Sequence, residues 1–378
     1  MPDTHLLQKN GILLYDFLLV RGGAESVTLE LLERLPGTDL CVEYYTPEFA
    51  NDLTMLNVAC RTLGAYTAIP GWQSIKGIFN FYVKTRFLVG YDWALYSGSN
   101  APVAVHNQKQ GRKYLYCHTI PRFAYDLEEY YIGRAQWWQY PLFLMLVRFV
   151  RWRYEAALSC MDVIVSNSEN TRRRLKKYIG FDSIVIHPPV ATDRFVWLGQ
   201  GDYYLSTSRV ESFKRVKLIV QAFCHMPESK LIVASGGTEL AALRKLAADA
   251  PNIRFTGWIT EQELQVLVGQ AIATIYIPID EDFGISPVES MAAGKPVIGV
   301  AQGGLLETII PDRTGVLLPP DPTVEELCTA VQAMTAEVAL SMRTACEEQA
   351  KLFGREVFVR KIGELLEMEQ MTFHETEK

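Results

Sequence analysis

Short apolar runs alternate along the chain with longer stretches in which apolar residues recur every three or four positions. The short runs are typical of buried strands, and the longer pattern is typical of amphipathic helices. Strands that alternate with helices predict parallel sheets with helical crossovers, which is an α/β fold. We expect strands at 11–16, 40–45, 93–97, 113–117 and 163–166, and again at 203–207, 230–234, 253–256, 273–277, 297–300 and 315–318.

A break in this pattern divides the chain. The segment HPPVATDRFVWLGQGD, at 187–202, contains two prolines and two glycines, which are typical of a hinge between domains. A length of 378 residues also exceeds the usual size of one hydrophobic core. We therefore predict an N-terminal domain at 1–192 and a C-terminal domain at 193–355. An amphipathic helix at 356–378 follows, and packing back on the N-terminal domain is one expectation for it.

Charge and cysteine content narrow the class of protein. The formal net charge of -6 argues against a general nucleic-acid binder. The seven cysteines are scattered and include no C-x-x-C pair, so neither a disulfide framework nor a zinc site is indicated. The first residues show no signal-peptide pattern, and no apolar run reaches the roughly 20 residues that span a bilayer. We expect a cytoplasmic protein.

A conspicuous group of polar residues follows the strand expected at 273–277. The sequence continues with PIDEDFG, which is typical of a loop, and then with SPVESMAAG, which is typical of the start of a helix. Ligands of open α/β sheets bind at such carboxyl ends of strands. Ser286, Pro287 and Glu289 also fit an S-x-x-E capping box with proline in the first turn. On spacing alone, a helix cap is the simpler interpretation of Glu289, and a ligand for sugar hydroxyls is the alternative.

Glu281 has no such structural role in the sequence pattern. Its simplest interpretation is a solvated loop acid, and the alternative is a hydrogen-bond acceptor for a ligand. Gly284 permits a close approach of the backbone, and a helix that begins nearby supplies amide donors favourable to phosphate. A carboxylate for hydroxyl groups and amides for phosphate together suit a nucleotide-sugar.

The segment that starts at Glu281, EDFGISPVESMAAGKPVIGVAQGGLLETI, resembles the retaining glycosyltransferases of family 4, group 1. Their E-x7-E hallmark is met by Glu281 and Glu289. The resemblance implies the GT-B architecture, with two facing Rossmann-like domains and the active site in the interdomain cleft. It also implies that Glu281 lies beside the donor sugar and that Glu289 holds the ribose. Contacts to the sugar or its phosphates are implied for Phe283, Gly284 and Ile285.

Two cations follow the strand expected at 203–207. Arg209 and Lys214 belong either to an ordinary solvated basic turn or, as the resemblance implies, to a clamp on the donor diphosphate. The resemblance predicts a metal-independent enzyme without a cofactor. Gly236, after the strand at 230–234, is either a plain turn residue or a close approach to the nucleotide. No G-x-G-x-x-G follows a strand, which argues against a dinucleotide oxidoreductase.

In the first half, Gly22 and Gly23 form either a tight turn or, as the resemblance implies, a backbone site near the donor phosphates. His118 ends a predicted strand and is either a structural histidine or a contact to the donor sugar. The predicted catalytic group is Glu281, His118, Arg209 and Lys214, and weaker acceptor-side candidates are Arg122, Tyr125 and Asp126.

Two further stretches, YCHTIPR and IVIHPPVATDRF, most resemble the mannosyltransferase branch that acts in bacterial surface-polysaccharide assembly. The function that this resemblance implies is transfer of mannose from GDP-mannose to a saccharide acceptor, expected to be lipid-linked. One alternative is transfer of glucose, galactose or N-acetylglucosamine from a UDP-sugar. Alternatives of another class are a nucleotide-sugar epimerase and a catalytically silent scaffold.

Aromatic and basic residues are interleaved ahead of residue 154. The run PLFLMLVRFV is too short and too charged to span a membrane. A helix packed into the protein, with snorkelling arginines, is the favoured interpretation. The alternative is peripheral contact with the inner face of a membrane. The residues concerned are Trp137, Trp138, Phe143, Phe149 and Trp152, with Arg134, Arg148, Arg151 and Arg153.

Overall fold

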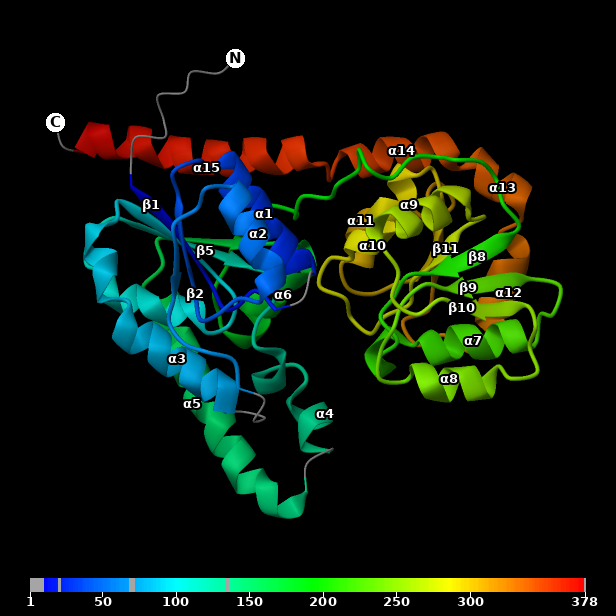
Figure 1. The fold of residues 1–378 in the computed structure, drawn as a ribbon, viewed down its shortest axis with the longest axis horizontal. Coiled ribbons are helices and arrows are strands. Elements are labelled where there is room, and N and C mark those ends of the chain that lie inside the picture. Colours follow the sequence, from blue (N-terminus) through cyan, green and yellow to red (C-terminus); the bar gives the residue numbers. More distant parts are fainter. Residues whose placement is uncertain (1–9, 20–21, 68–71, 134–135, 377–378) are drawn as a thin grey trace. The chain divides into compact units, whose positions relative to one another are not determined.

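The computed structural model describes residues 10–19, 22–67, 72–133 and 136–376. Arg134, which falls in the interleaved aromatic and basic stretch, lies outside this description. The chain forms two compact units, Met1–His187 with Val359–Lys378, and Pro188–Phe358. Figure 1 labels the helices and strands of both units.

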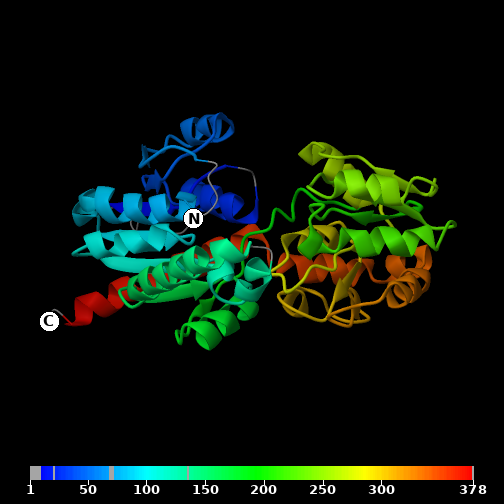
Figure 2. The same ribbon diagram turned by 90° about the horizontal axis from the view of Figure 1, so that it is seen from below.

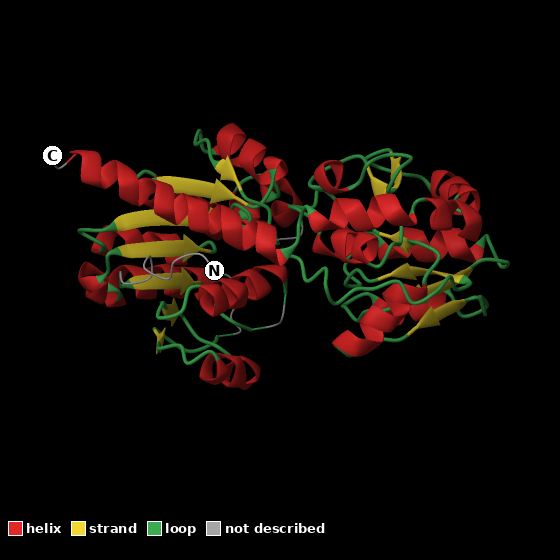
Figure 3. Cartoon of the chain, turned by 90° about the horizontal axis from the view of Figure 1, so that it is seen from above, coloured by secondary structure: helices red, strands yellow, loops and turns green. Residues whose placement is uncertain are grey.

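The first unit is built on a parallel sheet with the strand order β3-β2-β1-β4-β5-β6-β7. Every strand predicted for this half is present, and the short strands β3 and β7 at the sheet edges were not predicted. Figure 3 shows these strands side by side. Their bounds are Gly11–Tyr15 (β1), Asp39–Val42 (β2), Cys60–Thr62 (β3), Trp93–Ser97 (β4), Arg112–Cys117 (β5), Val163–Ser166 (β6) and Ile184–Val185 (β7).

Helices connect these strands, and their apolar faces complete the core of the first unit. The core includes Ile12, Tyr96 and Leu115 from the sheet and Phe81 and Tyr154 from the helices, all almost fully buried. The α-helices are Gly23–Arg34 (α1), Pro47–Met55 (α2), Trp72–Lys84 (α3), Glu128–Ile132 (α4), Tyr140–Leu158 (α5) and Glu169–Tyr178 (α6). The last helix, Arg355–Thr376 (α15), belongs to this unit from Val359 onward. The 3-10 helices are Arg86–Gly90 (η2), Ala101–Asn107 (η3), Arg122–Ala124 (η4) and Trp137–Gln139 (η5).

The second unit is a six-stranded parallel sheet with the order β10-β9-β8-β11-β12-β13. Figures 1 and 2 show α7 and α8 on one side of it and α9 and α10 on the other. The strands are Tyr203–Ser206 (β8), Lys230–Val233 (β9), Ile253–Phe255 (β10), Thr274–Ile275 (β11), Val297–Val300 (β12) and Gly315–Leu318 (β13). The helices are Ser212–Lys214 (η6), Val216–Cys224 (α7), Leu240–Leu246 (α8), Glu261–Gln270 (α9), Ile285–Ala292 (α10), Leu305–Thr308 (α11), Val324–Ala333 (α12), Ala336–Ser341 (α13) and Arg343–Lys351 (α14).

Both sheets are doubly wound, so the chain moves outward from a central strand first in one direction and then in the other. The order reverses between β1 and β4 in the first sheet and between β8 and β11 in the second. Loops that leave such a pair of strands diverge to opposite faces of the sheet, which opens space for a ligand at the carboxyl ends. These two positions are where the fold itself favours a binding site.

Candidate active site

The loops that leave β8 and β11 carry the predicted charged residues of the second unit. β8 and β11 are neighbours, with Thr274 paired to Leu205, and they flank the reversal of strand order. The loop after β8 contains Arg209 and Lys214, and the loop after β11 contains Glu281. The fold therefore brings together residues that lie about 70 positions apart in the sequence, at the place where a doubly wound sheet binds ligands.

Lys214 and Glu281 form an ion pair between these two loops. Lys214 Nζ lies 2.5 Å from Glu281 Oε2 and donates a second hydrogen bond of 3.2 Å to the hydroxyl of Tyr276. The lysine side chain is only 10% exposed and that of the glutamate 21%. The pair is thus largely shielded from water, so it is held more firmly than an exposed surface ion pair.

Tyr276 is a site residue that the sequence prediction missed. Its ring is buried just beyond the end of β11, and Lys214 Nζ lies 5.4 Å from the ring centroid. Burial, followed by the charge of Glu281, raises the pKa of Tyr276 well above its usual value, so the phenol stays protonated. The hydroxyl accepts from Lys214 and keeps its own proton for Glu281. A tyrosine next to the acidic loop was the available signal.

A backbone hydrogen bond and an aromatic ring hold the two loops together. The amide of Ile279 donates to the carbonyl of Phe213 across 2.8 Å. The ring centroid of Phe213 lies 5.5 Å from Lys214 Nζ. Phe213 is thus a second aromatic ring near this ammonium group, in addition to Tyr276. Lys214 is consequently placed by two aromatic rings and one carboxylate, which restricts the rotamers that its long side chain can adopt.

A pair of glycines supports the acidic loop from the next strand. The amide of Gly304 donates to the carbonyl of Glu281 across 2.9 Å. A Cβ at Gly303, where φ is +64°, would lie 2.4 Å from that carbonyl oxygen, and one at Gly304 would lie 2.4 Å from Cα of Phe283. Only glycine permits this close approach, which fixes the backbone that carries Glu281.

The capping box predicted for Ser286, Pro287 and Glu289 does not form. Helix α10 begins at Ile285, its N-cap is Gly284 in a left-handed conformation with φ of +90°, and no side chain caps it. The prediction is wrong because Gly284 turns the chain before Ser286, so Ser286 lies inside the first turn. Glu289 is therefore free of the structural role that its spacing suggested.

Glu289 is partly buried, and no hydrogen bond to its carboxylate is found among the described residues. Burial, together with the charge of Glu261, raises its pKa to about 7. A carboxyl group whose ionised form lacks hydrogen-bond donors is well suited to accept them from a ligand. Phe283 contributes differently, since its side chain packs against Phe353 in the core and leaves the backbone of this segment to face a ligand.

The predicted glycine turn after β9 lies beside the loop of Arg209. The amide of Val210 donates to the carbonyl of Gly236 across 2.9 Å. A Cβ on Gly236 would lie 2.4 Å from the indole nitrogen of Trp258, whose side chain is 69% exposed. Arg209 is also exposed, and it influences the ionisation of Tyr276. Arg209 and Gly236 therefore belong to the same edge of the sheet as Lys214.

In the first unit, His118 follows β5 and its imidazole lies between two tyrosine rings. The ring centroid of Tyr116 is 5.0 Å away and that of Tyr15 is 6.3 Å away. Nε2 of His118 is buried without a hydrogen-bond partner in the described chain, and burial lowers the pKa to about 4. The imidazole is therefore neutral at pH 7 and suited to hydrogen bonding rather than to charge pairing.

Gly22 and Gly23 follow the end of β1, beside the reversal of strand order in the first sheet. Gly22 is the N-cap of α1 and Gly23 its first residue, and both are exposed. Their position at a strand's carboxyl end agrees with either interpretation of these glycines, as a tight turn or as a backbone site for phosphate.

The three acceptor-side candidates are held in contacts with other protein side chains. Arg122 Nε donates to Asp126 Oδ2 across 2.9 Å. The ring of Tyr125 is buried, and its hydroxyl donates to Glu155 Oε1 across 3.0 Å. Their proposed role in acceptor binding stays a prediction.

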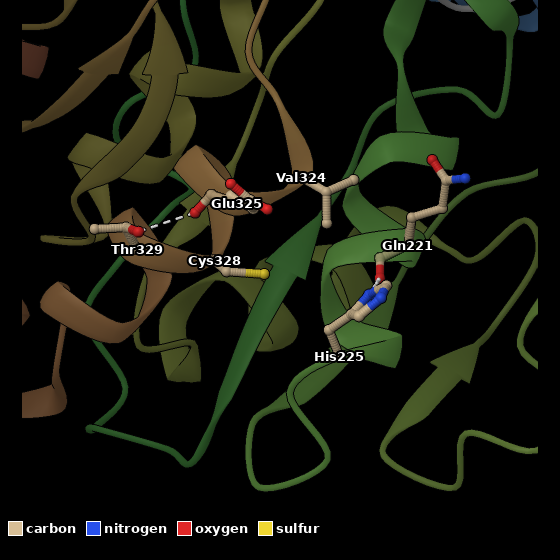
Figure 4. Close-up of a pocket in the computed structure, with 6 residues that line it drawn as sticks. All are labelled: Gln221, His225, Val324, Glu325, Cys328 and Thr329. Carbon is tan, nitrogen blue, oxygen red and sulfur yellow. Dashed lines mark hydrogen bonds between the residues drawn. The ribbon is translucent and has the colours of Figure 1, made fainter.

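Three other features of the described chain bear on function. No group of His, Cys, Asp and Glu side chains with the geometry of a metal site is found among the described residues. No described helix is long and apolar enough to cross a membrane. A cavity of about 490 Å³ lies between α7 and α12, and Figure 4 shows its lining. None of the predicted site residues lines it.

The second unit is thus a Rossmann-like ligand-binding unit with a cation, a carboxylate and helix amides at its switch point. Comparison with known families agrees with this class. Residues 193–353 match the model "Glycosyl transferases group 1", and residues 21–194 match "Glycosyltransferase Family 4". The chain belongs to this glycosyltransferase family.

Two relatives and one solved structure illustrate the similarity. An α-1,3/1,6-mannosyltransferase, ALG2, of Dictyostelium discoideum is 28% identical over 47% of this chain and 53% of its own length. A GDP-mannose-dependent α-(1-6)-phosphatidylinositol monomannoside mannosyltransferase of Mycolicibacterium smegmatis is 28% identical over the same shares. The chain thus spans about half the length of these curated relatives.

The structure of sucrose-phosphate synthase from Thermosynechococcus elongatus superimposes with a TM-score of 0.76 at 19% identity, over 96% of this chain and 100% of that one. This likeness shows the fold. The predicted GT-B architecture, made of two Rossmann-like domains, is confirmed.

Proposed function

We propose that this protein transfers mannose from GDP-mannose to a hydroxyl group of a saccharide acceptor, with retention of the anomeric configuration. The second unit binds the donor in this proposal. Lys214 and Arg209 contact the diphosphate, Glu281 contacts the sugar, and Glu289 accepts hydrogen bonds from the ribose. The amides at the start of α10 and the backbone at Gly284 and Ile285 face the phosphates or the sugar.

The ion pair between Lys214 and Glu281 is the observation that carries the proposal. It places one ammonium and one carboxylate at a single point of the switch region, 2.5 Å apart. A nucleotide-sugar has a matching junction, where the anionic diphosphate is joined to a ring that carries hydroxyl groups. When the bond at this junction breaks, negative charge grows on the diphosphate, and a fixed cation stabilises it without reorganisation.

Several finer features of the proposal have different support. The choice of mannose and of GDP rests on the names of the two relatives and on the stretches around His118 and His187. A lipid-linked acceptor is supported by the acceptor that the Mycolicibacterium relative's name gives. A protein that works on such an acceptor is expected in the cytoplasm, in peripheral contact with the inner face of the membrane. Metal independence and the absence of a cofactor remain part of the proposal.

A donor screen tests this function. Purified protein is incubated with GDP-mannose, UDP-glucose, UDP-galactose and UDP-N-acetylglucosamine, with and without saccharide acceptors, in the presence of EDTA. The proposal predicts release of GDP that depends on the acceptor, together with an α-linked product by NMR. Conversion of the donor without an acceptor would indicate an epimerase. If no donor raises the melting temperature or is consumed, a scaffold role replaces the proposal.

A further inference from the structure

Helix α5 buries one face in the first unit along its second half. Val147, Val150, Tyr154, Ala157 and Leu158 are almost fully buried there. Their spacing of three or four residues is the ordinary pattern of a helix packed on a core. The inner face of α5 therefore has its apolar partners within the unit.

The outer face of the same helix is also apolar and is uncovered. Trp137 and Trp138 in η5 are 78% and 60% exposed, and Leu142, Met145 and Trp152 on α5 are 65%, 61% and 62% exposed. Figure 1 shows the N-terminal half of α5 running away from the sheet of its unit. The favoured prediction of a packed helix is wrong for Trp137, Trp138 and Trp152, which no described element of the unit covers, whereas Phe143 and Phe149 do pack against the core.

Helix α3 extends this uncovered area. The guanidinium of Arg153 on α5 lies 4.3 Å from the ring centroid of Tyr82 on α3, so the two helices are adjacent. Phe79, Tyr82 and Val83 are 61%, 46% and 40% exposed. Together with the outer residues of η5 and α5 they form what we call the α5 surface: Phe79, Tyr82, Val83, Trp137, Trp138, Leu142, Met145 and Trp152. Exposed apolar side chains gathered on adjacent helices in this way mark an interaction site.

The charge of the surrounding chain indicates which kind of partner the α5 surface binds. The sequence from 130 to 154 contains four arginines and no acidic residue, and one of them, Arg151, is paired with Glu128 of α4. Arg148 is exposed on α5. A second copy of this chain, bound face to face, would bring two copies of Arg148 to one interface, which is unfavourable. An anionic lipid surface provides both the opposite charge and an apolar interior, and tryptophan favours the boundary between them.

We propose that the α5 surface binds an anionic lipid bilayer, with Trp137, Trp138, Leu142 and Met145 inserted at the headgroup boundary. This inference names a binding surface for the membrane contact proposed above and does not depend on the transfer reaction. The helix lies in the plane of the interface, since it carries too many charged residues to cross the bilayer.

Vesicle flotation tests the proposal with the full chain. We expect the wild-type protein to float with vesicles of phosphatidylglycerol and phosphatidylcholine and to float at least tenfold less with phosphatidylcholine alone. The variant Trp137→Ser/Leu142→Ser/Met145→Ser should lose at least tenfold in its partition coefficient, and Arg148→Glu should lose the preference for anionic lipid. Brominated lipids should quench tryptophan fluorescence, less so in Trp137→Phe/Trp138→Phe.

A matched control separates this surface from exposed apolar residues in general. Met55 and Leu352 are 86% and 59% exposed and lie elsewhere, so Met55→Ser/Leu352→Ser should bind vesicles like the wild type. Far-UV circular dichroism and the melting temperature verify that each variant is folded. The proposal is overturned if wild-type protein does not bind anionic vesicles or if the triple variant binds them equally well. A concentration-dependent dimer that the triple variant abolishes, without vesicle binding, would assign the surface to self-association.

Discussion

Lys214 Nζ lies 2.5 Å from Oε2 of Glu281, and the hydroxyl of Tyr276 contacts the lysine at 3.2 Å. The lysine and the glutamate come from loops that leave neighbouring strands on either side of the reversal in strand order. Each charge is thus positioned by the other before any ligand binds. A diphosphate that approaches Lys214 meets a cation whose direction is already set, which lowers the entropic cost of binding.

Removal of the lysine should weaken diphosphate binding more than it weakens the fold. We expect Lys214→Ala to raise the Kd for GDP by about tenfold to a hundredfold, since a charge-assisted hydrogen bond contributes about 1.5–3 kcal/mol. Isothermal titration calorimetry measures this. Lys217→Ala removes the same charge from an exposed position nearby and should leave Kd within twofold. Equal effects of the two substitutions would show that only the general positive charge of the loop matters.

Tyr276 should act as a positioning residue for the ion pair. Tyr276→Phe keeps the ring beside Lys214 and removes only the hydroxyl, so kcat is expected to fall about tenfold while the Kd for GDP changes less than threefold. Steady-state kinetics with a saccharide acceptor measures the split between kcat and KM.

Tyr204→Phe is the matched control for that substitution. Tyr204 is buried in the same unit, and its hydroxyl donates to the carbonyls of Val331 and Met334, away from the ion pair. Both variants should lose about 1–2 kcal/mol of unfolding free energy. A similar kcat loss in both would mean that Tyr276 has a structural role only.

The pKa of about 7 at Glu289 predicts that nucleotide binding depends on pH. Ribose hydroxyls that donate to the carboxylate favour its ionised form, so binding lowers this pKa and releases protons near pH 7. Calorimetry in buffers of different ionisation enthalpy counts the released protons. Glu289→Gln should release fewer protons than the wild type, and an unchanged count would remove Glu289 from the ribose site.

The same carboxyl group should also affect stability in a defined direction. Because its folded-state pKa is raised above the usual 4.5, its stabilising contribution is fully present below about pH 4.5 and is lost as the pH rises through about 7. The free energy of unfolding of the wild type should therefore fall relative to Glu289→Gln over this window. Chemical denaturation at a series of pH values checks the sign, and the opposite slope would contradict the raised pKa.

The glycine support beneath the acidic loop gives a further prediction. A Cβ at Gly303 meets the carbonyl oxygen of Glu281 at 2.4 Å, so Gly303→Ala should displace that loop and reduce both transfer and melting temperature. Gly37 also has a positive φ, +83°, but a Cβ there meets nothing within 4 Å. Gly37→Ala should thus show only the backbone cost of about 1–2 kcal/mol. If Gly303→Ala is as active as Gly37→Ala, the glycine at position 303 does not hold the loop of Glu281 in place.

The periodicity of the sequence predicted the interior strands well, because buried strands of parallel sheets are short continuous apolar runs such as 297–300. The edge strands β3 and β7 were missed because their residues are partly exposed and carry no such run. The outer face of α5 was misinterpreted for a related reason. Periodicity indicates which faces are apolar, but the absence of a covering layer is a property of the three-dimensional structure.

Within the site, the charged residues were visible in the sequence and their relationships were not. Arg209, Lys214 and Glu281 stood out as polar residues after strands, but their contact depends on β8 and β11 being neighbours. The capping box was expected from a local pattern, and Gly284 overrode it by ending the loop two residues before Ser286. Tyr276 was missed because a tyrosine that ends a buried strand is usually part of the core, and its place next to the acidic loop was the only signal available.

Transfer by Glu281→Gln is the most direct test of the assignment of this site. The substitution keeps the size of the side chain and removes the charge that faces Lys214, and Glu325→Gln makes the same change at an exposed position outside the site. We predict that Glu281→Gln still binds GDP, with a Kd within about tenfold of the wild type, while product formation from GDP-mannose is largely abolished. Wild-type turnover by Glu281→Gln would contradict the assignment.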